Sequence, residues 1–182
     1  MGMGVSACAT CDGFFYKDRE VALVGAGDSA CEEALYLSNI CTTVHMIVRK
    51  DAMRASKIMQ ERVFKTKNIK VYWNTETDQV LGEKEVEGVR VLNNKTGDKT
   101  DIPLYGFFVA IGHKPNSDFA KDYLDTDAAG YVITKPGSTK TNIEGVFACG
   151  DLQDSIYRQA VTAAGTGCMA ALDAERFISE QE

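Results

Sequence analysis

The chain is poor in positive charge and has no long apolar run. Its 20 Lys and Arg residues against 26 Asp and Glu leave a formal net charge of −6, which disfavours nucleic acid or an anionic membrane as partner. No window is apolar over the length that a bilayer requires. The start, Met1–Val5, lacks the basic and apolar regions of a secretory signal. We therefore expect a cytoplasmic protein that binds neither a membrane nor nucleic acid.

Histidine and closely spaced cysteines are also scarce. Of six cysteines only Cys8 and Cys11 form a close pair, and the two histidines, His45 and His113, lie at unrelated places. A zinc site usually takes four ligands from two such pairs, or from one pair and closely spaced histidines, so no metal is expected. The other four cysteines are scattered through apolar or helical stretches, which excludes the dense framework of a secreted disulfide scaffold.

The chain does carry the strand–turn–helix–strand pattern of a nucleotide-binding α/β fold. Val21–Val24 is a short apolar run typical of a buried strand, and Gly25–Gly27 breaks it. A helix follows to about Asn39, with Ala30, Ala34 and Leu37 on one face, and Thr43–Val48 is the next strand. The crossover predicts a parallel sheet.

The remaining pattern predicts a Rossmann-like domain with an inserted antiparallel ribbon over residues 1–112, and an incomplete domain over residues 113–182. The segment 112–116 is the candidate linker between them. The further expected elements are a helix over 52–67 with Ile58 and Met59 toward the core, a strand over 69–73, a hairpin of 77–81 with 87–92, a turn at 94–98, a buried strand over 104–111, short strands near 131–133 and 146–148, and a helix over 157–179 with a potential break at 165–167.

The turn at Gly25 fits the dinucleotide-binding pattern G-x-G-x-x-G/A. Gly25 makes the tight turn, Gly27 lets the backbone approach a pyrophosphate, and Ala30 lets the helix pack closely. Asp28 or Ser29 is the expected helix cap. The helix N-terminus then offers free N–H groups to the phosphates. The alternative is a tight turn without a ligand.

The end of the second strand favours NADPH over NADH. In NAD binders an acidic residue stands about 20 positions after the turn, whereas Arg49 and Lys50 follow Val48 here and Arg54 comes soon after. These cations suit a 2′-phosphate, which a guanidinium can bind through two hydrogen bonds. The alternatives are a salt bridge from the neighbouring Asp51 and a solvated basic helix start.

The pair Cys8-x-x-Cys11 is consistent with a redox disulfide. One thiol of such a pair attacks a partner's disulfide and the other resolves the mixed disulfide. A thioredoxin-like domain would place the pair after a strand, and no strand is expected before Cys8. Asp12 is placed to exchange a proton with a thiol, although an acid before Gly13 also suits a plain turn.

Taken together, the motifs resemble the low-molecular-weight thioredoxin reductases over residues 4–178. They occur in the order Ser6-Ala7-Cys8-Ala9-Thr10-Cys11-Asp12-Gly13-Phe14-Phe15-Tyr16, Gly25-Ala26-Gly27-Asp28-Ser29-Ala30, Arg49-Lys50 with Arg54, Ala110-Ile111-Gly112-His113-Lys114-Pro115-Asn116, Gly145-Val146-Phe147-Ala148-Cys149-Gly150-Asp151, Tyr157-Arg158-Gln159-Ala160 and Gly165-Thr166-Gly167-Cys168-Met169-Ala170-Ala171. In that family the position of Val48 is often histidine and that of Lys50 often arginine.

The resemblance implies a flavoprotein of the type with two dinucleotide-binding domains and assigns its sites. The catalytic residues would be Cys8 and Cys11, with Asp12 as proton donor. The NADPH-binding residues would be Gly25, Gly27, Ser29, Arg49, Lys50 and Arg54, and Asp28, Ile111 and Gly112 would also bind a cofactor. The flavin-binding residues would be Gly150, Asp151, Arg158, Gln159 and Ala160. Residues 113–182 would be the C-terminal portion of the FAD-binding domain.

The implied activity is thioredoxin-disulfide reduction, with electrons passing from NADPH through FAD and the Cys8–Cys11 disulfide to a thioredoxin-like protein. The family is usually homodimeric and rotates its domains, here at expected hinges near Gly4 and 112–116. Its members begin with an FAD-binding turn that is not found before Cys8, so FAD binding by this chain is expected to be weak. The alternatives are a NADPH-binding fragment without turnover and the flavoprotein subunit of an alkyl hydroperoxide reductase. The cysteine pair argues against ferredoxin–NADP reductases of the same architecture.

Overall fold

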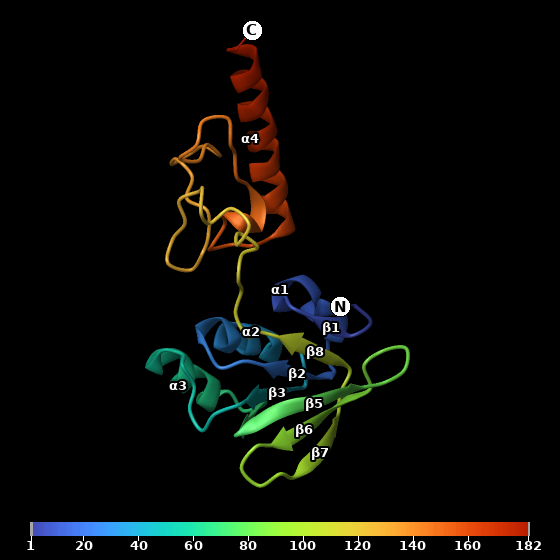
Figure 1. The fold of residues 1–182 in the computed structure, drawn as a ribbon. Helices are drawn as coiled ribbons and strands as arrows, with labels where there is room; N and C mark the ends of the chain where they lie inside the picture. Colours follow the sequence, from blue (N-terminus) through green and yellow to red (C-terminus); the bar gives the residue numbers. More distant parts are fainter. Residues whose placement is uncertain (1, 182) are drawn as a thin grey trace. The chain divides into compact units, whose positions relative to one another are not determined.

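The computed structural model describes residues 2–181, which divide into two compact units (Figure 1). The first is Met1–Gly112 and the second is His113–Glu182. Within the described residues, no helix is both long and apolar enough to cross a membrane. Each unit is described separately below.

A five-stranded parallel sheet forms the centre of the first unit. The strands lie in the order β1-β8-β2-β3-β4, with bounds β1 Val5–Ser6, β2 Glu20–Val24, β3 Thr43–Val48, β4 Ile69–Trp73 and β8 Gly106–Val109. The strands predicted at 21–24, 43–48 and 69–73 are confirmed, and β8 is shorter than the predicted 104–111. The central strands β2, β3 and β8 are mostly apolar and buried because the sheet is covered on both faces.

Two helices cover one face of this sheet, α2 (Asp28–Ser38) and α3 (Lys57–Lys65). The predicted inner face of α2 is confirmed, since Ala30, Ala34 and Leu37 pack with Leu23 and Phe108 in one buried cluster. Helix α3 is shorter than expected and buries Val63. The prediction that Ile58 faces the core is wrong, because Ile58 is 63% exposed, whereas Met59 does pack against the cluster.

An antiparallel ribbon covers the other face of the sheet. It consists of β5 (Thr75–Leu81), β6 (Gly88–Asn93) and β7 (Lys99–Pro103), in that order. Its buried residues Val89, Val91 and Ile102 pack with Ala22 and Ile47 of the sheet. The predicted hairpin is confirmed. Strand β7 was not predicted because only Ile102 of its five residues is buried, so the segment shows no apolar alternation.

The segment around the cysteine pair begins with a short strand, so the prediction that no strand precedes Cys8 is wrong. Val5 and Ser6 pair in parallel with Phe107 and Phe108 of β8. A two-residue strand held by backbone bonds has no apolar run that would reveal it. Helix α1 (Ala9–Asp12) and a 3₁₀ turn, η1 (Gly13–Tyr16), follow directly.

The second unit is built from loops around one long helix, α4 (Ala160–Ser179), with a 3₁₀ turn η2 (Gly150–Leu152). The short strands expected near 131–133 and 146–148 are wrong: the chain makes isolated bridges there, Thr126 with Val132 and Lys140 with Phe147. The potential break at 165–167 is also wrong, because α4 continues through it. Glycine inside a helix costs about 1 kcal/mol relative to alanine, which a 20-residue helix tolerates.

Candidate functional site

The cysteine pair lies at the start of helix α1. Cys8 and Cys11 form a disulfide with their Cα atoms 5.3 Å apart. Cys8 is the N-cap of the helix, and its Sγ accepts a hydrogen bond of 3.2 Å from the backbone N–H of Cys11. Cys8 is half-buried and Cys11 is exposed, so the sulfur pair is accessible from solvent.

Asp12 is held beside this pair by Ser6 of strand β1. The Ser6 hydroxyl donates to the Asp12 carboxylate at 2.6 Å and accepts from the Cys8 backbone N–H at 3.1 Å. Burial raises the pKa of Tyr16, and the charge of Asp12 raises it further. The carboxylate is therefore fixed within the same turn of chain as both sulfur atoms, one residue after Cys11.

Two exposed aromatic side chains follow the disulfide. Phe14 is 72% exposed and Phe15 is 75% exposed, both in the turn η1 next to α1. Large apolar side chains that stay in water at this level are typical of a surface for a protein partner.

The nucleotide-type turn combines a crowded glycine with an open one. A Cβ on Gly25 would collide with the carbonyl oxygen of Ala110, so only glycine fits. A Cβ on Gly27 would meet no heavy atom of the described residues within 4 Å. The first glycine therefore serves packing, and the second leaves space above the start of α2.

The expected cap of α2 is wrong. Gly27 is the N-cap, and Asp28 is already the first helical residue. Its carboxylate accepts from the backbone N–H of Ser56 at 2.9 Å and from the Ser56 hydroxyl at 2.7 Å. These bonds, the backbone one foremost, hold the pKa of Asp28 below its usual value. Asp28 thus fastens the loop before α3 to the glycine turn.

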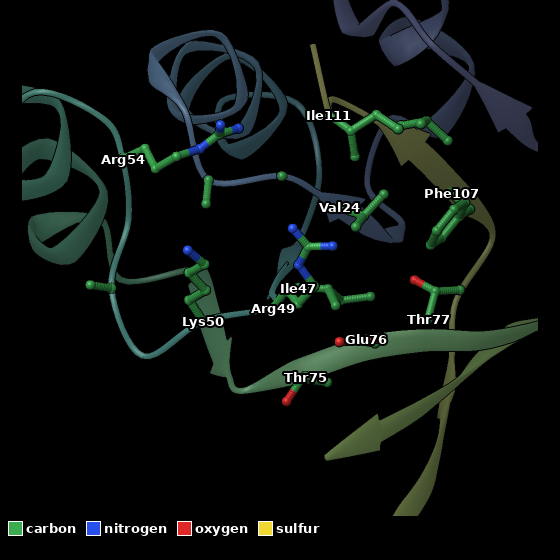
Figure 2. Close-up of a pocket in the computed structure, with 14 residues that line it drawn as sticks. Val24, Ile47, Arg49, Lys50, Arg54, Thr75, Glu76, Thr77, Phe107 and Ile111 are labelled. Carbon is green, nitrogen blue, oxygen red and sulfur yellow. The ribbon is translucent and has the colours of Figure 1, made fainter. Parts of the chain in front are cut away.

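A cavity of about 530 Å³ opens beside this turn. Of the predicted site residues, it is lined by Gly25, Arg49, Lys50, Arg54 and Ile111. In Figure 2, Arg54 and Lys50 lie toward one end, the apolar side chains of Val24, Phe107 and Ile111 toward the other, and Arg49 between them. We call the segment 49–54, which carries Arg49, Lys50 and Arg54, the cationic loop. The backbone N–H of Arg54 donates to the Ala26 carbonyl at 2.8 Å, which joins this loop to the glycine turn.

Other predicted residues lie outside this lining, and the sequence reasoning missed several that belong to it. Gly27, Asp28, Ser29 and Gly112 are not among the described residues that line the cavity. The missed residues are Val24, Ala26, Ile47, Ala52, Thr75, Glu76, Thr77, Phe107 and Val109. Those on β5 could not be found from a local motif, because the ribbon meets the sheet only through the tertiary fold.

In the second unit the predicted residues gather at the start of α4. Gln159 is the N-cap and forms a capping box with Thr162. Arg158 has a φ of 49°, and its guanidinium donates to the Tyr131 hydroxyl at 3.3 Å. Ala160 begins the helix. The carboxylate of Asp154 accepts from the backbone N–H groups of residues 156, 157 and 158, so one acid shapes the loop that presents these residues.

Asp154 and the turn at Gly150 complete this group. Burial acts to raise the pKa of Asp154, but the backbone N–H bonds outweigh it and leave the pKa lowered. The backbone N–H of Gly150 donates to the Thr166 hydroxyl of α4 at 2.9 Å, and Asp151 follows on the exposed side. Within residues 2–181, no three His, Cys, Asp or Glu side chains gather as they would around a metal ion.

Comparison with known proteins gives consistent results. Residues 1–167 match the family described as "Pyridine nucleotide-disulphide oxidoreductase". Two similar proteins are called "Thioredoxin reductase": one from Dictyostelium discoideum, 53% identical over 97% of this chain and 56% of its own length, and one from Rickettsia bellii, 55% identical over 99% of this chain and 59% of its own length. The chain thus spans less than two thirds of these relatives.

Solved structures of thioredoxin reductases have the same fold. The structure from Streptococcus pyogenes superposes with a TM-score of 0.91 at 37% identity, over 98% of this chain and 58% of that one. The structure from Giardia duodenalis superposes with a TM-score of 0.86 at 43% identity, over 97% of this chain and 58% of that one.

Proposed function

The chain belongs to the pyridine nucleotide-disulphide oxidoreductase family, and from this we propose that it acts in a thioredoxin-disulfide reductase that draws its electrons from NADPH. The observation that carries the proposal is the presence of two sites on one unit. An accessible disulfide, Cys8–Cys11, begins α1, and a cationic cavity opens at the Gly25 turn. Such a unit has both a place for a reducing nucleotide and an acceptor for its electrons.

In this proposal residues 1–112 form the NADPH-binding domain. Arg49, Lys50 and Arg54 would bind the 2′-phosphate. The open space above Gly27 suits the pyrophosphate, which the N-terminus of α2 would bind through its free N–H groups. Ile111 would border the nucleotide at the apolar end of the cavity, and Asp28, Ser29 and Gly112 would support the turn from outside the lining.

Residues 113–182 would form the C-terminal portion of an FAD-binding domain. Gly150 and Asp151 would approach the flavin nucleotide, and Arg158, Gln159 and Ala160 would lie against its ring. The fit rests on the loop that Asp154 shapes and on backbone groups at the start of α4. When bound, NADPH supplies a hydride and FAD a two-electron relay.

The chain's own chemistry is the opening and closing of the Cys8–Cys11 bond. Two electrons and two protons convert the disulfide into a dithiol. One thiolate then attacks the partner's disulfide, and the second cysteine attacks the mixed disulfide. This regenerates Cys8–Cys11 and releases the partner as a dithiol. Asp12, held by Ser6, would give a proton to the departing thiolate or take one from the attacking thiol.

The partner would be a thioredoxin-like protein, which would dock on Phe14 and Phe15 beside the disulfide. An intact enzyme of this kind would act as a homodimer in the cytoplasm. The flavoprotein subunit of an alkyl hydroperoxide reductase would instead pass electrons to a peroxide-reducing system.

The decisive experiment is a single turnover without added cofactors. The chain is reduced with dithiothreitol, desalted and mixed with oxidised thioredoxin. We expect about one thioredoxin disulfide to be reduced per chain, with Cys8–Cys11 oxidised in return. Cys8→Ser and Cys11→Ser should abolish the complete exchange, whereas the matched change Cys168→Ser, at an exposed thiol of α4, should leave it intact. A reduced chain that leaves thioredoxin oxidised overturns the proposal, and transfer to a peroxide-reducing partner alone would favour the second function.

A further inference from the structure

The cavity that holds three cations also holds one acid. Glu76 of β5 lines it together with Arg49, Lys50 and Arg54. A carboxylate in a pocket for a 2′-phosphate is unexpected, because it repels the phosphate that the cations attract. The end of β3 carries no acid, but the ribbon brings one to the cavity from 27 positions further along the chain, counted from Arg49.

Asn94 fixes the place of this acid relative to the cationic loop. The side-chain nitrogen Nδ2 of Asn94 donates to Glu76 Oε1 at 3.1 Å and to the backbone carbonyl of Arg49 at 2.8 Å. One nitrogen atom therefore joins the acid to the residue that begins the cationic loop. In Figure 2, Glu76 lies on β5 between Thr75 and Thr77, on the ribbon side of the cavity.

The backbone reinforces the same connection. The N–H of Asn94 donates to the Asn74 carbonyl at 2.7 Å, and the N–H of Asn74 donates to the Lys50 carbonyl at 3.1 Å. The start of the ribbon and the cationic loop are thus joined through two successive residues, Arg49 and Lys50. A shift of the loop that carries Arg49 and Lys50 away from the ribbon, and so away from Glu76, would break these bonds.

We propose that Glu76 is a specificity-determining residue that narrows the preference of the cavity for a phosphorylated nucleotide, and that Asn94 is the positioning residue that holds it there. The inference rests on the proposed nucleotide site. A carboxylate accepts hydrogen bonds from an unmodified ribose hydroxyl, as in NAD binders, and repels a 2′-phosphate. Glu76 therefore favours NADH in a cavity whose cations favour NADPH.

The test measures the dissociation constants of NADPH and NADH for the full chain by calorimetry at low ionic strength, where charges are least screened. Glu76→Gln should tighten NADPH and weaken NADH. The ratio of the NADH to the NADPH constant should rise about two- to fivefold, as expected for one exposed charge. The matched control Glu83→Gln makes the same change of charge at an exposed turn of the ribbon that does not line the cavity, and should leave the ratio unchanged.

A double-mutant cycle tests the role of Asn94. Asn94→Ala should move the ratio in the same direction as Glu76→Gln, and should move it little further when Glu76 is already Gln, because Asn94 then has no acid to hold. Equal weakening of both nucleotides in Glu76→Gln, or an unchanged ratio, overturns the inference. Failure of the unaltered chain to bind either nucleotide would instead overturn the proposed nucleotide site and, with it, this inference.

Discussion

Helices α2 and α4 use their apolar residues in different ways. Helix α2 has 11 residues and buries Ala30, Cys31, Ala34 and Leu37 against the parallel sheet. Helix α4 has 20 residues, all in the described part of the chain, and none of them is buried. Its Val161 is 77% exposed and its Leu172 is 46% exposed. Apolar packing between layers thus holds the first unit together. In the second unit, hydrogen bonds to polar side chains hold much of the chain in place.

Carboxylates anchor the loops of the second unit. Asp154 accepts three backbone N–H bonds of the loop before α4. Asp173 of α4 accepts bonds from the hydroxyls of Ser138 and Thr139 and from the Thr139 backbone. Thr139 is almost fully buried. The comparison teaches that the two units should respond differently to the same kind of perturbation.

The largest difference is expected from removing one large apolar side chain from each unit. Phe108 is fully buried and packs edge-on against Tyr16, so Phe108→Ala should lower the free energy of unfolding by about 3–5 kcal/mol. Leu172→Ala on α4 should lower it by less than about 1 kcal/mol. Urea unfolding measures both. The fluorescence of Trp73, the single tryptophan, reports the first unit. Circular dichroism at 222 nm reports the helices of both units, so the part of its transition that does not coincide with that of Trp73 reports α4. Equal losses for the two variants would contradict the comparison.

The next effect is expected inside the first unit, at the two glycines of the turn. Gly25→Ala must push its Cβ into the Ala110 carbonyl and should destabilise the unit by about 1–3 kcal/mol. Gly27→Ala enters open space, so the unit should keep its stability while NADPH binding weakens. Trp73 fluorescence in urea gives the stabilities, and calorimetry gives the binding. A destabilised Gly27→Ala with unchanged binding would show that the space above Gly27 is not a ligand site.

A smaller effect separates the units in acid. The pKa of Asp154 is lowered in the folded chain from about 3.9 in the unfolded chain. The stability that it contributes is therefore present above about pH 4 and is lost as the pH falls through the folded pKa. Between pH 7 and pH 3, the melting of α4, taken as the part of the 222 nm transition that does not coincide with that of Trp73, should shift down less in Asp154→Asn than in the unaltered chain. The Trp73 transition serves as internal control, since the substitution should leave its acid shift unchanged.

The smallest perturbation is thiol labelling, which should leave the fold intact. Burial raises the pKa of Cys31 and of Cys41 to about 11, so neither should react quickly with Ellman's reagent at pH 8. Cys168 on α4 is exposed and should react first. Mass spectrometry of the labelled chain identifies the site, and Cys168→Ser should remove the fast phase. Fast labelling of Cys31 would mean that the first unit opens to solvent as readily as the second unit.

The same contrast explains how much of the fold could be predicted. The apolar runs at 21–24 and 43–48 and the inner face of α2 belong to layers that bury them, so periodicity alone located them. Strands β1 and β7 were missed because backbone pairing rather than apolar pattern holds them. In the second unit, apolar triplets were mistaken for strands where the chain makes only single bridges.

The candidate site divides in a similar way. Gly25 lies within one strand–helix–strand motif, and Arg49, Lys50 and Arg54 follow its second strand directly, so this local pattern indicated residues that line the cavity. Glu76 reaches it only because β5 crosses the sheet, and no local pattern carries that information. The prediction that Asp28 caps α2 failed because its carboxylate accepts two hydrogen bonds from Ser56, which is 28 positions further along the chain.

The ribbon that walls the cavity has a consequence for how this protein can be altered. Its strands are hydrogen-bonded to one another as a separate sheet, and they contribute Glu76 without supplying a strand to the parallel sheet. The exposed positions of β5 can therefore be substituted, by design or in evolution, while the sequences of β2 and β3 stay unchanged. In the proposed nucleotide site, the contribution of Glu76 to coenzyme choice would therefore be separate from the buried residues on which folding of the first unit depends.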